Sequence, residues 1–414
     1  METVELARPE AQTSRHMRRI TRTSGFQWWF PISLFLGVRM LNAITIAFAS
    51  RNQIPVDRAN DMGMYVHTDK PANPGYWGVI TNWDGQWYES IATEGYGAPQ
   101  PGATDGEDAL WTWAFPPLFP LLARCVMLLT GLPFAQAATI LNLLFGALGM
   151  VLLYKLLNRA GGVFLAVSGI ALINCFISAP LIQAAYSESV AFMLLMGVFL
   201  KLQARSYLTA GFLICLLAFT RLITAPLALI GLVHLMWLLR GRGTNRIPAR
   251  QVAGIAFVVF VSLVGTFMWP MTAGALASGS TGASARLQAQ SSFHLGWFSD
   301  AYHYFGPSGT IAVALLLLFL LLLACSPRTQ HWGLELRTWL AAYPSFLMLV
   351  TGISGGIFRY LLLCPPIALI AAGGPAAPRR QRTAVVLGAC LFGLALQYLW
   401  IHRFLAIPGN HLMP

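Results

Sequence analysis

The sequence has little charge, and acidic residues are the scarcest part of it. Only 10% of the 414 residues are charged, and Asp and Glu together number 15. A soluble domain carries about 25% charged residues, so this composition excludes a soluble globular protein. Hydrophobic residues make up 56% of the chain, and the mean hydropathy is +0.61. These values indicate an all-α integral membrane protein that crosses the bilayer many times.

Lysine is almost absent, and cysteine forms no recognisable motif. Lysine occurs only at Lys70, Lys155 and Lys201, so arginine supplies nearly all of the net charge of +12. The basic residues stand in short clusters between apolar runs, which is typical of membrane-orientation signals and does not suggest nucleic-acid binding. The six cysteines are isolated, without CxxC or Cys/His spacing, so we expect neither a disulfide nor a metal site. No cofactor is expected either.

The sequence also lacks an internal repeat. Transporters usually show repeated halves and helices broken near the bilayer midplane. Here nine of the acids lie in one loop, residues 51–113. These features argue against a lipid or solute transporter or flippase, which remains the alternative function.

Apolar runs and flanking charges predict the topology. Residues 1–27 form a basic tail on the cytoplasmic side. The apolar run that follows is too long for a signal-peptide core, so we expect no cleavable signal and a retained first span. A transmembrane domain is expected over 28–403, with external loops at 51–133 and 273–308 and a short external tail at 404–414. The Ala, Gly and Arg content favours a bacterial plasma membrane.

Two segments decide the number of spans. Residues 115–130 begin Phe-Pro-Pro-Leu-Phe-Pro, an unfavourable start for a spanning helix because each proline removes a donor. We expect this segment to lie in the interface or to enter and return. Residues 207–239 form one tilted helix or two short spans, and two keep the basic loops on one side. The eleven expected spans lie near 28–50, 134–157, 162–182, 186–203, 207–220, 222–239, 251–272, 309–325, 336–352, 357–374 and 383–403.

One stretch in the first external loop combines aromatic and acidic residues: WDGQWYESIATEGYG, residues 83–97. On a helix Trp83, Trp87 and Ile91 share one face, and Gly95 is a stop signal. We expect this helix to lie flat on the bilayer. Its tryptophans would enter the interface while Asp84 and Glu94 face water.

Polar residues that play no part in orientation all fall on the non-cytoplasmic side in this topology. Charged groups at membrane depth are costly and usually functional, so their convergence predicts a site on that face. The residues are Asp84, the run Tyr186-Ser187-Glu188, Arg221, His294 and Asp300 of the 273–308 loop, and the pair Arg359-Tyr360.

These motifs resemble the PIG-V-type mannosyltransferases of the GT-C class of integral-membrane glycosyltransferases. The resemblance rests on WDGQWYESIATEGYG, FPPLFPLLAR, AAYSES, FTR (219–221) and FRYLLLCPP (358–366), in the family's order. It implies a polyprenyl-phosphate-linked sugar donor, usually mannose, and an acceptor hydroxyl on the external side. It also implies that an aspartate of the first external loop, here Asp84, is the general base, and that amphipathic helices lie in that loop.

Each candidate residue has a plainer interpretation beside the functional one. Asp84 could merely favour the positive start of a helix, but the flanking tryptophans and the resemblance favour a base that takes the acceptor proton. Glu188 could be a helix-start charge capped by Ser187; alternatively it contacts sugar hydroxyls. Arg221 and Arg359 could extend to the lipid headgroups or hold the donor phosphate.

The remaining residues complete the predicted site. Trp83 flanks the base, Tyr88, Tyr186 and Glu188 line the sugar site, and Tyr360 adjoins Arg359; His294 is given a minor phosphate contact. The hypothesis is an inverting mannosyl transfer from a polyprenyl-phosphate donor to a glycolipid, polysaccharide or protein acceptor among membrane lipids. A non-catalytic membrane scaffold is a third possibility. The sequence specifies neither the donor sugar nor the acceptor.

Overall fold

A computed structural model describes residues 25–57, 67–97, 112–241, 248–276 and 295–408. In these ranges the regular structure is helical, and the only extended pairing is an isolated antiparallel bridge between Val56 and Lys70. The prediction of an all-α chain is confirmed. His294, given a phosphate contact from the sequence, lies outside the described residues.

Among the described residues, five helices are long and apolar enough to cross a bilayer. The chain is therefore an all-α membrane protein, although the eleven predicted spans are not all of this kind and their number stays a prediction. The five are α2 (Phe26–Ala49), α7 (Phe134–Asn174), α11 (Ala249–Leu276), α13 (Gly296–Cys325) and α17 (Arg379–Trp400).

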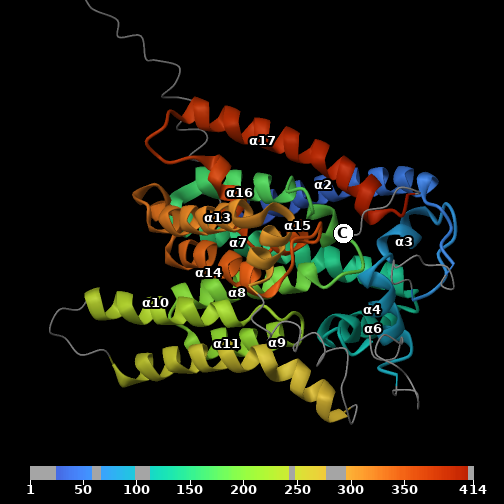
Figure 1. Cartoon of the computed structure of the whole chain (residues 1–414), viewed down its shortest axis with the longest axis horizontal. Helices are drawn as coiled ribbons and strands as arrows, with labels where there is room; N and C mark the ends of the chain where they lie inside the picture. The colour runs from blue at the N-terminus through green and yellow to red at the C-terminus, as the bar shows by residue number, and fades with distance from the viewer. Residues whose placement is uncertain (1–24, 58–66, 98–111, 242–247, 277–294, 409–414) are drawn as a thin grey trace, which may run out of the picture.

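Shorter helices pack among these five (Figure 1). Four of them follow the first loop: α8 (Glu188–Gln203), α9 (Tyr207–Ala218), α10 (Ala225–Gly241) and α14 (Leu334–Val350). Three lie in the first loop: α3 (Gly75–Ile80), α4 (Asp84–Thr93) and α6 (Leu118–Thr130). Two are single turns, α15 (Ile357–Leu361) and α16 (Pro365–Leu369).

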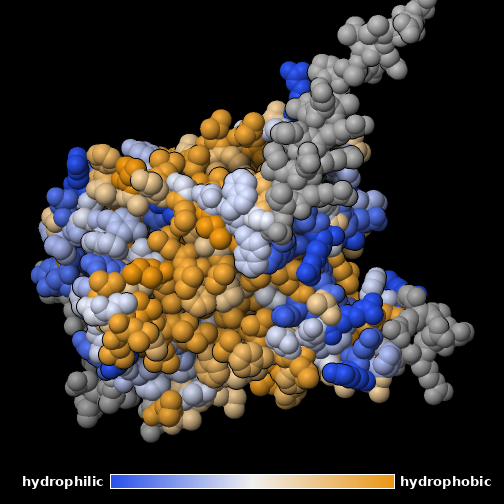
Figure 2. Space-filling model, turned by 180° about the vertical axis from the view of Figure 1, so that it is seen from behind, coloured by the Kyte–Doolittle hydropathy of each residue, from blue (hydrophilic) through white to orange (hydrophobic). Residues whose placement is uncertain are grey.

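The surface divides into an apolar middle and two hydrophilic ends. Figure 2 shows a broad hydrophobic area across the molecule, with hydrophilic residues gathered on both sides of it. Large apolar side chains are exposed on α11, α13 and α17 as well, among them Phe260, Leu322 and Leu391. Such a surface needs a hydrocarbon surrounding.

Contacts between distant segments show which residues share an end of the bundle. The Lys155 Nζ lies 3.5 Å from the Trp28 ring centroid, the Arg382 guanidinium lies 4.2 Å from that of Phe164, and Gln203 donates to Glu335. The basic loops at these positions thus meet at one end, as the topology requires. Helices α3, α4 and α6 lie at the other (Figure 1). Which compartment each end faces stays a prediction.

Two predicted spans are less regular than expected. The segment expected at 357–374 is divided into α15 and α16, because Pro365 and Pro366 cannot donate hydrogen bonds to continue a helix. Helix α7 bends at Gly162, where φ is 80°, and it ends at Asn174, short of the expected 182. In contrast, the two-helix interpretation of 207–239 is confirmed by α9 and α10.

The first-loop helices differ from the flat arrangement that the sequence suggested. Trp83 and Trp87 are buried within the protein. The Trp87 ring stacks on His67 at 4.3 Å and lies near Phe115, because α4 packs against α6 and so covers its own apolar face. Gly95, with φ of 90°, follows the end of α4 as expected.

Helix α6 is too short to span the membrane. Its 13 residues rise about 20 Å, whereas the hydrocarbon core is about 30 Å thick. Leu128 and Leu129 near its end are highly exposed. The helix therefore fits the predicted interfacial placement of 115–130.

Candidate active site

Four charged residues from four segments meet at the start of α4. The Arg359 Nη2 lies 2.6 Å from the Asp84 Oδ2, and the Arg359 Nε donates to the Glu188 Oε1. The Arg221 Nη1 lies 2.6 Å from the same Glu188 oxygen. We call Asp84, Glu188, Arg221 and Arg359 the ion cluster. It joins residues that the sequence singled out separately on the same predicted face.

Both acids of the ion cluster begin helices. Asp84 is the first residue of α4, and Glu188 is the first residue of α8. The positive end of each helix dipole stabilises a carboxylate there. Ser187 makes no capping hydrogen bond, so the capping interpretation of that position does not hold.

The backbone before Asp84 has an unusual conformation. Trp83 has φ of 56° and ψ of −121°, a region that L residues seldom adopt and that surrounding contacts must maintain. The Leu405 carbonyl supplies such contacts: it accepts hydrogen bonds from the Trp83 Nε1 at 3.3 Å and from the Asn82 Nδ2 at 3.0 Å. The strained residue therefore fixes the direction in which α4, and with it Asp84, begins.

Close packing at Gly85 brings α4 against the segment before α8. A Cβ at Gly85 would lie 3.2 Å from the Ile80 carbonyl oxygen and 3.6 Å from the Ala185 Cβ. The Ala185 N–H in turn donates to the Ile80 carbonyl at 3.0 Å. The small residues allow the two segments, and thus Asp84 and Glu188, to approach each other.

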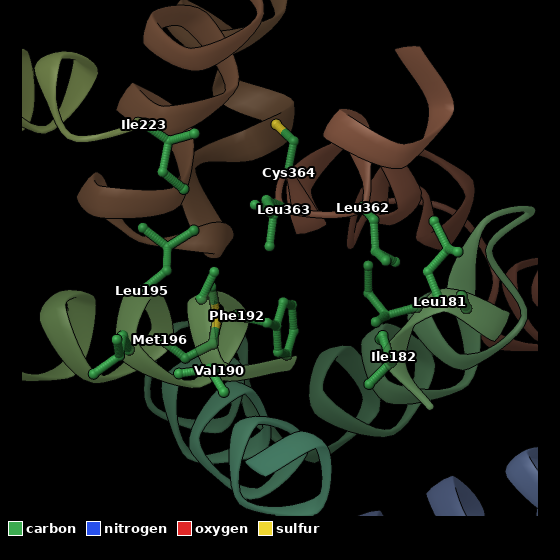
Figure 3. Close-up of a cluster of buried hydrophobic side chains, with 14 of the residues drawn as sticks. Leu181, Ile182, Val190, Phe192, Leu195, Met196, Ile223, Leu362, Leu363 and Cys364 are labelled. Carbon is green, nitrogen blue, oxygen red and sulfur yellow. The ribbon is translucent and has the colours of Figure 1, made fainter. Parts of the chain in front are cut away.

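Buried apolar side chains pack between the segments that carry the ion cluster (Figure 3). Figure 3 shows Leu195 of α8 pointing toward Ile223, with Phe192 below the turn after α15 and Val190 on the lower side of the helix. These side chains are buried. Since each lies a few residues from Glu188, Arg359 or Arg221, packing of these side chains positions the three segments that carry the buried charges. The turn residues are Leu362, Leu363 and Cys364.

Burial distinguishes the two acids. The Glu188 side chain is fully buried, whereas 24% of the Asp84 side chain is exposed. The two arginines are mostly buried, and their charges balance those of the two acids. Burying charge is costly unless it is paired. Glu188 thus serves as the internal counter-ion, while Asp84 is the acid that a ligand can reach.

A cavity of about 100 Å³ opens beside the ion cluster. Asp84, Arg221 and Arg359 reach it, together with Tyr88 and Tyr360. Its remaining walls are mostly apolar and come from the segment 114–116 and from α14. Trp83, Tyr186 and Glu188, which the sequence also assigned to the site, do not line this cavity and lie behind it.

Tyr88 connects the cavity to the start of α8. Its hydroxyl donates to the Ser187 Oγ at 2.9 Å, and its ring packs edge-on against Phe115 and Phe119. Burial, and next the negative charge of Asp84, raise the pKa of Tyr88 to about 12. The phenol therefore stays neutral and remains a hydrogen-bond donor in the physiological pH range.

An aromatic ring lies against each of the two arginines of the ion cluster. The Arg359 guanidinium lies 4.7 Å from the centroid of Tyr186, whose hydroxyl donates to the Asn82 carbonyl at 3.0 Å. The Arg221 guanidinium lies 5.7 Å from the centroid of Tyr360. Tyr343 donates to the Tyr360 carbonyl at 3.2 Å. These ring contacts fix the planes of both guanidinium groups.

Sequence reasoning identified the members of the ion cluster but not their pairing. Arg221 and Arg359 do not extend to headgroups, as the plainer interpretation would have it; both contact Glu188 inside the protein. Tyr343, which lines the cavity, was not singled out. The pairing could have been predicted from one feature of the sequence. Glu188 is the only acid between residues 109 and 299, and it lies on the same predicted side as two isolated arginines.

Within the described ranges, no group of three or more His, Cys, Asp or Glu side chains is placed to hold a metal ion. Comparison with protein-family models and with curated proteins finds no match to this chain. The function must therefore be argued from the site itself.

Proposed function

We propose that the chain is a membrane glycosyltransferase that moves a hexose, mannose first among the candidates, from a polyprenyl-phosphate donor to an acceptor hydroxyl. The observation that carries this proposal is the cavity itself. One reachable carboxylate and two arginines border the same small space at one end of an apolar bundle. Such a set suits a reaction that removes a proton from a hydroxyl and leaves negative charge on a phosphate.

The reaction needs one base and a cationic clamp. The acceptor oxygen forms a bond to the anomeric carbon, while the bond from that carbon to the phosphate oxygen breaks. The hydroxyl proton passes to the Asp84 carboxylate, and the electron pair leaves with the polyprenyl phosphate. Attack opposite the leaving group inverts the anomeric centre. Arg359 and Arg221 stabilise the phosphate charge.

The ion pair between Arg359 and Asp84 implies an exchange when the donor binds. With Arg359 2.6 Å away, Asp84 is a weak base, because a nearby positive charge favours its ionised form. A donor phosphate would compete for Arg359 and free the carboxylate to accept a proton. The cavity of about 100 Å³ is also smaller than the roughly 300–1,000 Å³ typical of ligand pockets, so substrate entry must widen it.

An apolar approach to the cavity supports a lipid-linked donor. Thr351 lines the cavity and accepts a hydrogen bond from the Trp297 Nε1 at 3.1 Å. Trp297 belongs to α13, on which Tyr302 and Phe305 are strongly exposed. Exposed aromatic side chains of this kind occur at membrane interfaces, where the phosphate of a polyprenyl donor also lies.

Sugar transfer in membranes would test the proposal. Radiolabelled polyprenyl-phosphate-mannose is supplied to membranes that contain equal amounts of wild type, Asp84→Asn or Glu94→Gln. Glu94 is an exposed acid directly after the same helix, so its variant is the matched control. We expect Asp84→Asn to lower transfer by roughly 10²–10⁴-fold and Glu94→Gln to leave it unchanged.

Two outcomes would contradict the proposal. Equal transfer by wild type and Asp84→Asn would remove Asp84 from the chemistry. Absence of transfer by wild type with mannose, glucose and galactose donors would favour the transporter alternative.

A further inference from the structure

A second cavity, of about 650 Å³, lies at the opposite end of the bundle from the ion cluster. Its walls are residues 205–209, where α8 gives way to α9, and residues 250–257 at the beginning of α11. Helix α8 separates the two cavities: Glu188 begins it, and Arg205 follows its end. Its 16 residues rise about 24 Å. We call this space the basic cavity.

The walls of the basic cavity are positive and contain no acid. Arg205 and Arg250 both line it, and both side chains are exposed. Arg205, two residues after the end of α8, has a positive φ of 56°, and its guanidinium lies 5.5 Å from the Trp237 ring centroid. Among the described residues no carboxylate lines the cavity beside them, and two such guanidinium groups attract an anion.

Two helices also begin at this cavity. Helix α9 starts at Tyr207 and α11 at Ala249, and their first turns form the two walls. First-turn N–H groups have no partner within their helix, and the helix dipole makes this end positive. Ser206, which precedes α9, makes no side-chain capping bond. Backbone and side chains therefore favour negative charge at the same place.

Unpartnered polar atoms provide an independent sign of a ligand. Tyr207 is 95% buried, with 5% exposure, and lines the cavity. Its hydroxyl is buried and has no hydrogen-bond partner among the described residues. The Oε1 of Gln251, on the opposite wall, is also buried and also has no hydrogen-bond partner among the described residues. Buried polar groups are normally satisfied, so these atoms call for a ligand with both an acceptor and a donor.

The edge of the basic cavity is apolar in the direction of the membrane. Leu208 and Phe257 line it and are exposed. Phe212 and Phe260, one helical turn further along α9 and α11, are also strongly exposed. Residues three or four apart share a helix face, so an apolar track continues from the cavity along both helices.

We propose that the basic cavity binds the headgroup of an anionic phospholipid whose acyl chains lie along α9 and α11. The phosphate contacts Arg205, Arg250 and the first-turn N–H groups. A headgroup hydroxyl, as in a phosphatidylglycerol, donates to Gln251, and a headgroup oxygen accepts from Tyr207. A free inorganic phosphate shares the anionic part of this chemistry but would not use the apolar track.

Lipid binding to the purified full-length protein would test this site. The protein is delipidated in a neutral detergent, and retained lipid and the thermal unfolding midpoint are measured with dioleoyl phosphatidylglycerol, dioleoyl phosphatidylcholine, glycerol phosphate or inorganic phosphate. We expect phosphatidylglycerol alone to be retained and to raise the midpoint. Arg205→Gln combined with Arg250→Gln should weaken its binding roughly 30-fold.

Matched variants keep the test specific. Arg328→Gln and Arg380→Gln remove exposed arginines that do not line the basic cavity, and both should bind phosphatidylglycerol as wild type does. Arg250→Gln alone, at an exposed helix start, serves if the double variant fails to fold. Tyr207→Phe should weaken binding several-fold.

Three results would overturn the proposal. The first is equal retention of phosphatidylglycerol and phosphatidylcholine. The second is unchanged binding in the arginine variants. The third is an equal rise of the midpoint with inorganic phosphate alone, which would show a site for free anions.

Discussion

The two ends of the bundle hold arginines in opposite surroundings. In the ion cluster, Arg221 and Arg359 are mostly buried and contact carboxylates of two helix starts. At the basic cavity, Arg205 and Arg250 are exposed, and no acid lines the walls. Helices begin at both ends, so the positive ends of helix dipoles contribute in each. The difference lies in whether the protein supplies its own anion.

This difference separates two uses of the same side chain. Where the protein provides Glu188 and Asp84, the guanidinium groups have fixed positions before any substrate arrives, as a catalytic clamp requires. Where it provides none, the positive charge is available to an anion from the surroundings. The ion cluster should therefore dominate stability and catalysis, and the basic cavity should affect lipid binding.

The largest expected effect comes from Glu188→Gln. It leaves two mostly buried guanidinium groups without their shared carboxylate, and removing one partner of a buried ion pair costs about 3–5 kcal/mol. We expect the free energy of unfolding in detergent to fall by that amount. Glu335→Gln is the control, since Glu335 is also buried but bonds to His234 and Gln203; it should cost only about 1–3 kcal/mol. Equal losses would show that the ion cluster contributes no more to stability than the contacts of Glu335.

Arg359→Lys should retain the positive charge but lose the simultaneous contacts with Asp84 and Glu188. Arg359 contacts Asp84 and Glu188 through different nitrogens, which a single ammonium group cannot reproduce. We expect the rate of sugar transfer to fall about 100-fold. Arg221→Lys should cost less, about 10-fold, because Arg221 pairs with one carboxylate, Glu188, through one nitrogen. A larger loss in Arg221→Lys would reassign the main phosphate contact.

Tyr88→Phe removes one buried hydrogen bond, to Ser187. We expect the free energy of unfolding to fall by about 1 kcal/mol at pH 7. Measuring stability under the same conditions with Ser187→Ala, alone and combined, gives the coupling of the pair. Additive losses would mean that the hydrogen bond contributes nothing.

The pKa of Tyr88 predicts a pH dependence for wild type. Burial raises this pKa from 10 to about 12, so the folded protein keeps a proton that the unfolded chain loses between these values. The stability contribution is complete below pH 10 and is lost as pH rises through 12. In Tyr88→Phe, the free energy of unfolding should therefore fall less steeply over this interval. An identical slope would contradict the pKa assignment.

The smallest expected effect completes the comparison at the other end. Arg250→Gln changes an exposed side chain at the start of α11. In lipid-free detergent, the free energy of unfolding should stay within about 0.5 kcal/mol of wild type. A loss as large as that of Glu188→Gln would mean that Arg250 has a structural partner and that the two ends are alike.

Much of the fold follows from local sequence. Long apolar runs predicted α2, α11 and α17 with small errors in their bounds, because a helix in hydrocarbon satisfies its own backbone. Gly95 was predicted as a stop from residue type alone and has the positive φ that a stop requires. The division of 357–374 into two helices was not predicted, although the sequence contains Pro365 and Pro366. Mean hydropathy does not register that proline lacks a backbone hydrogen-bond donor.

The candidate site was predicted in membership but not in geometry. The predicted topology, which placed charged residues at membrane depth on one side, identified Asp84, Glu188, Arg221 and Arg359. That Glu188 binds both arginines depends on contacts across up to 171 residues, which no local pattern encodes. The burial of Trp83 and Trp87 was missed for a related reason: an aromatic face covered by α6 has the same sequence pattern as one covered by lipid.

The hydrogen bonds from Asn82 and Trp83 to the Leu405 carbonyl have a consequence for biosynthesis. The chain emerges from the N-terminus onward, so the segment that bears the proposed base is made more than 300 residues before its anchor. Until α15 and the end of α17 have entered the membrane, Asp84 lacks Arg359 and Trp83 lacks the contact that supports its backbone. A nascent chain therefore carries this carboxylate long before the residues that pair with it and support its backbone have been made.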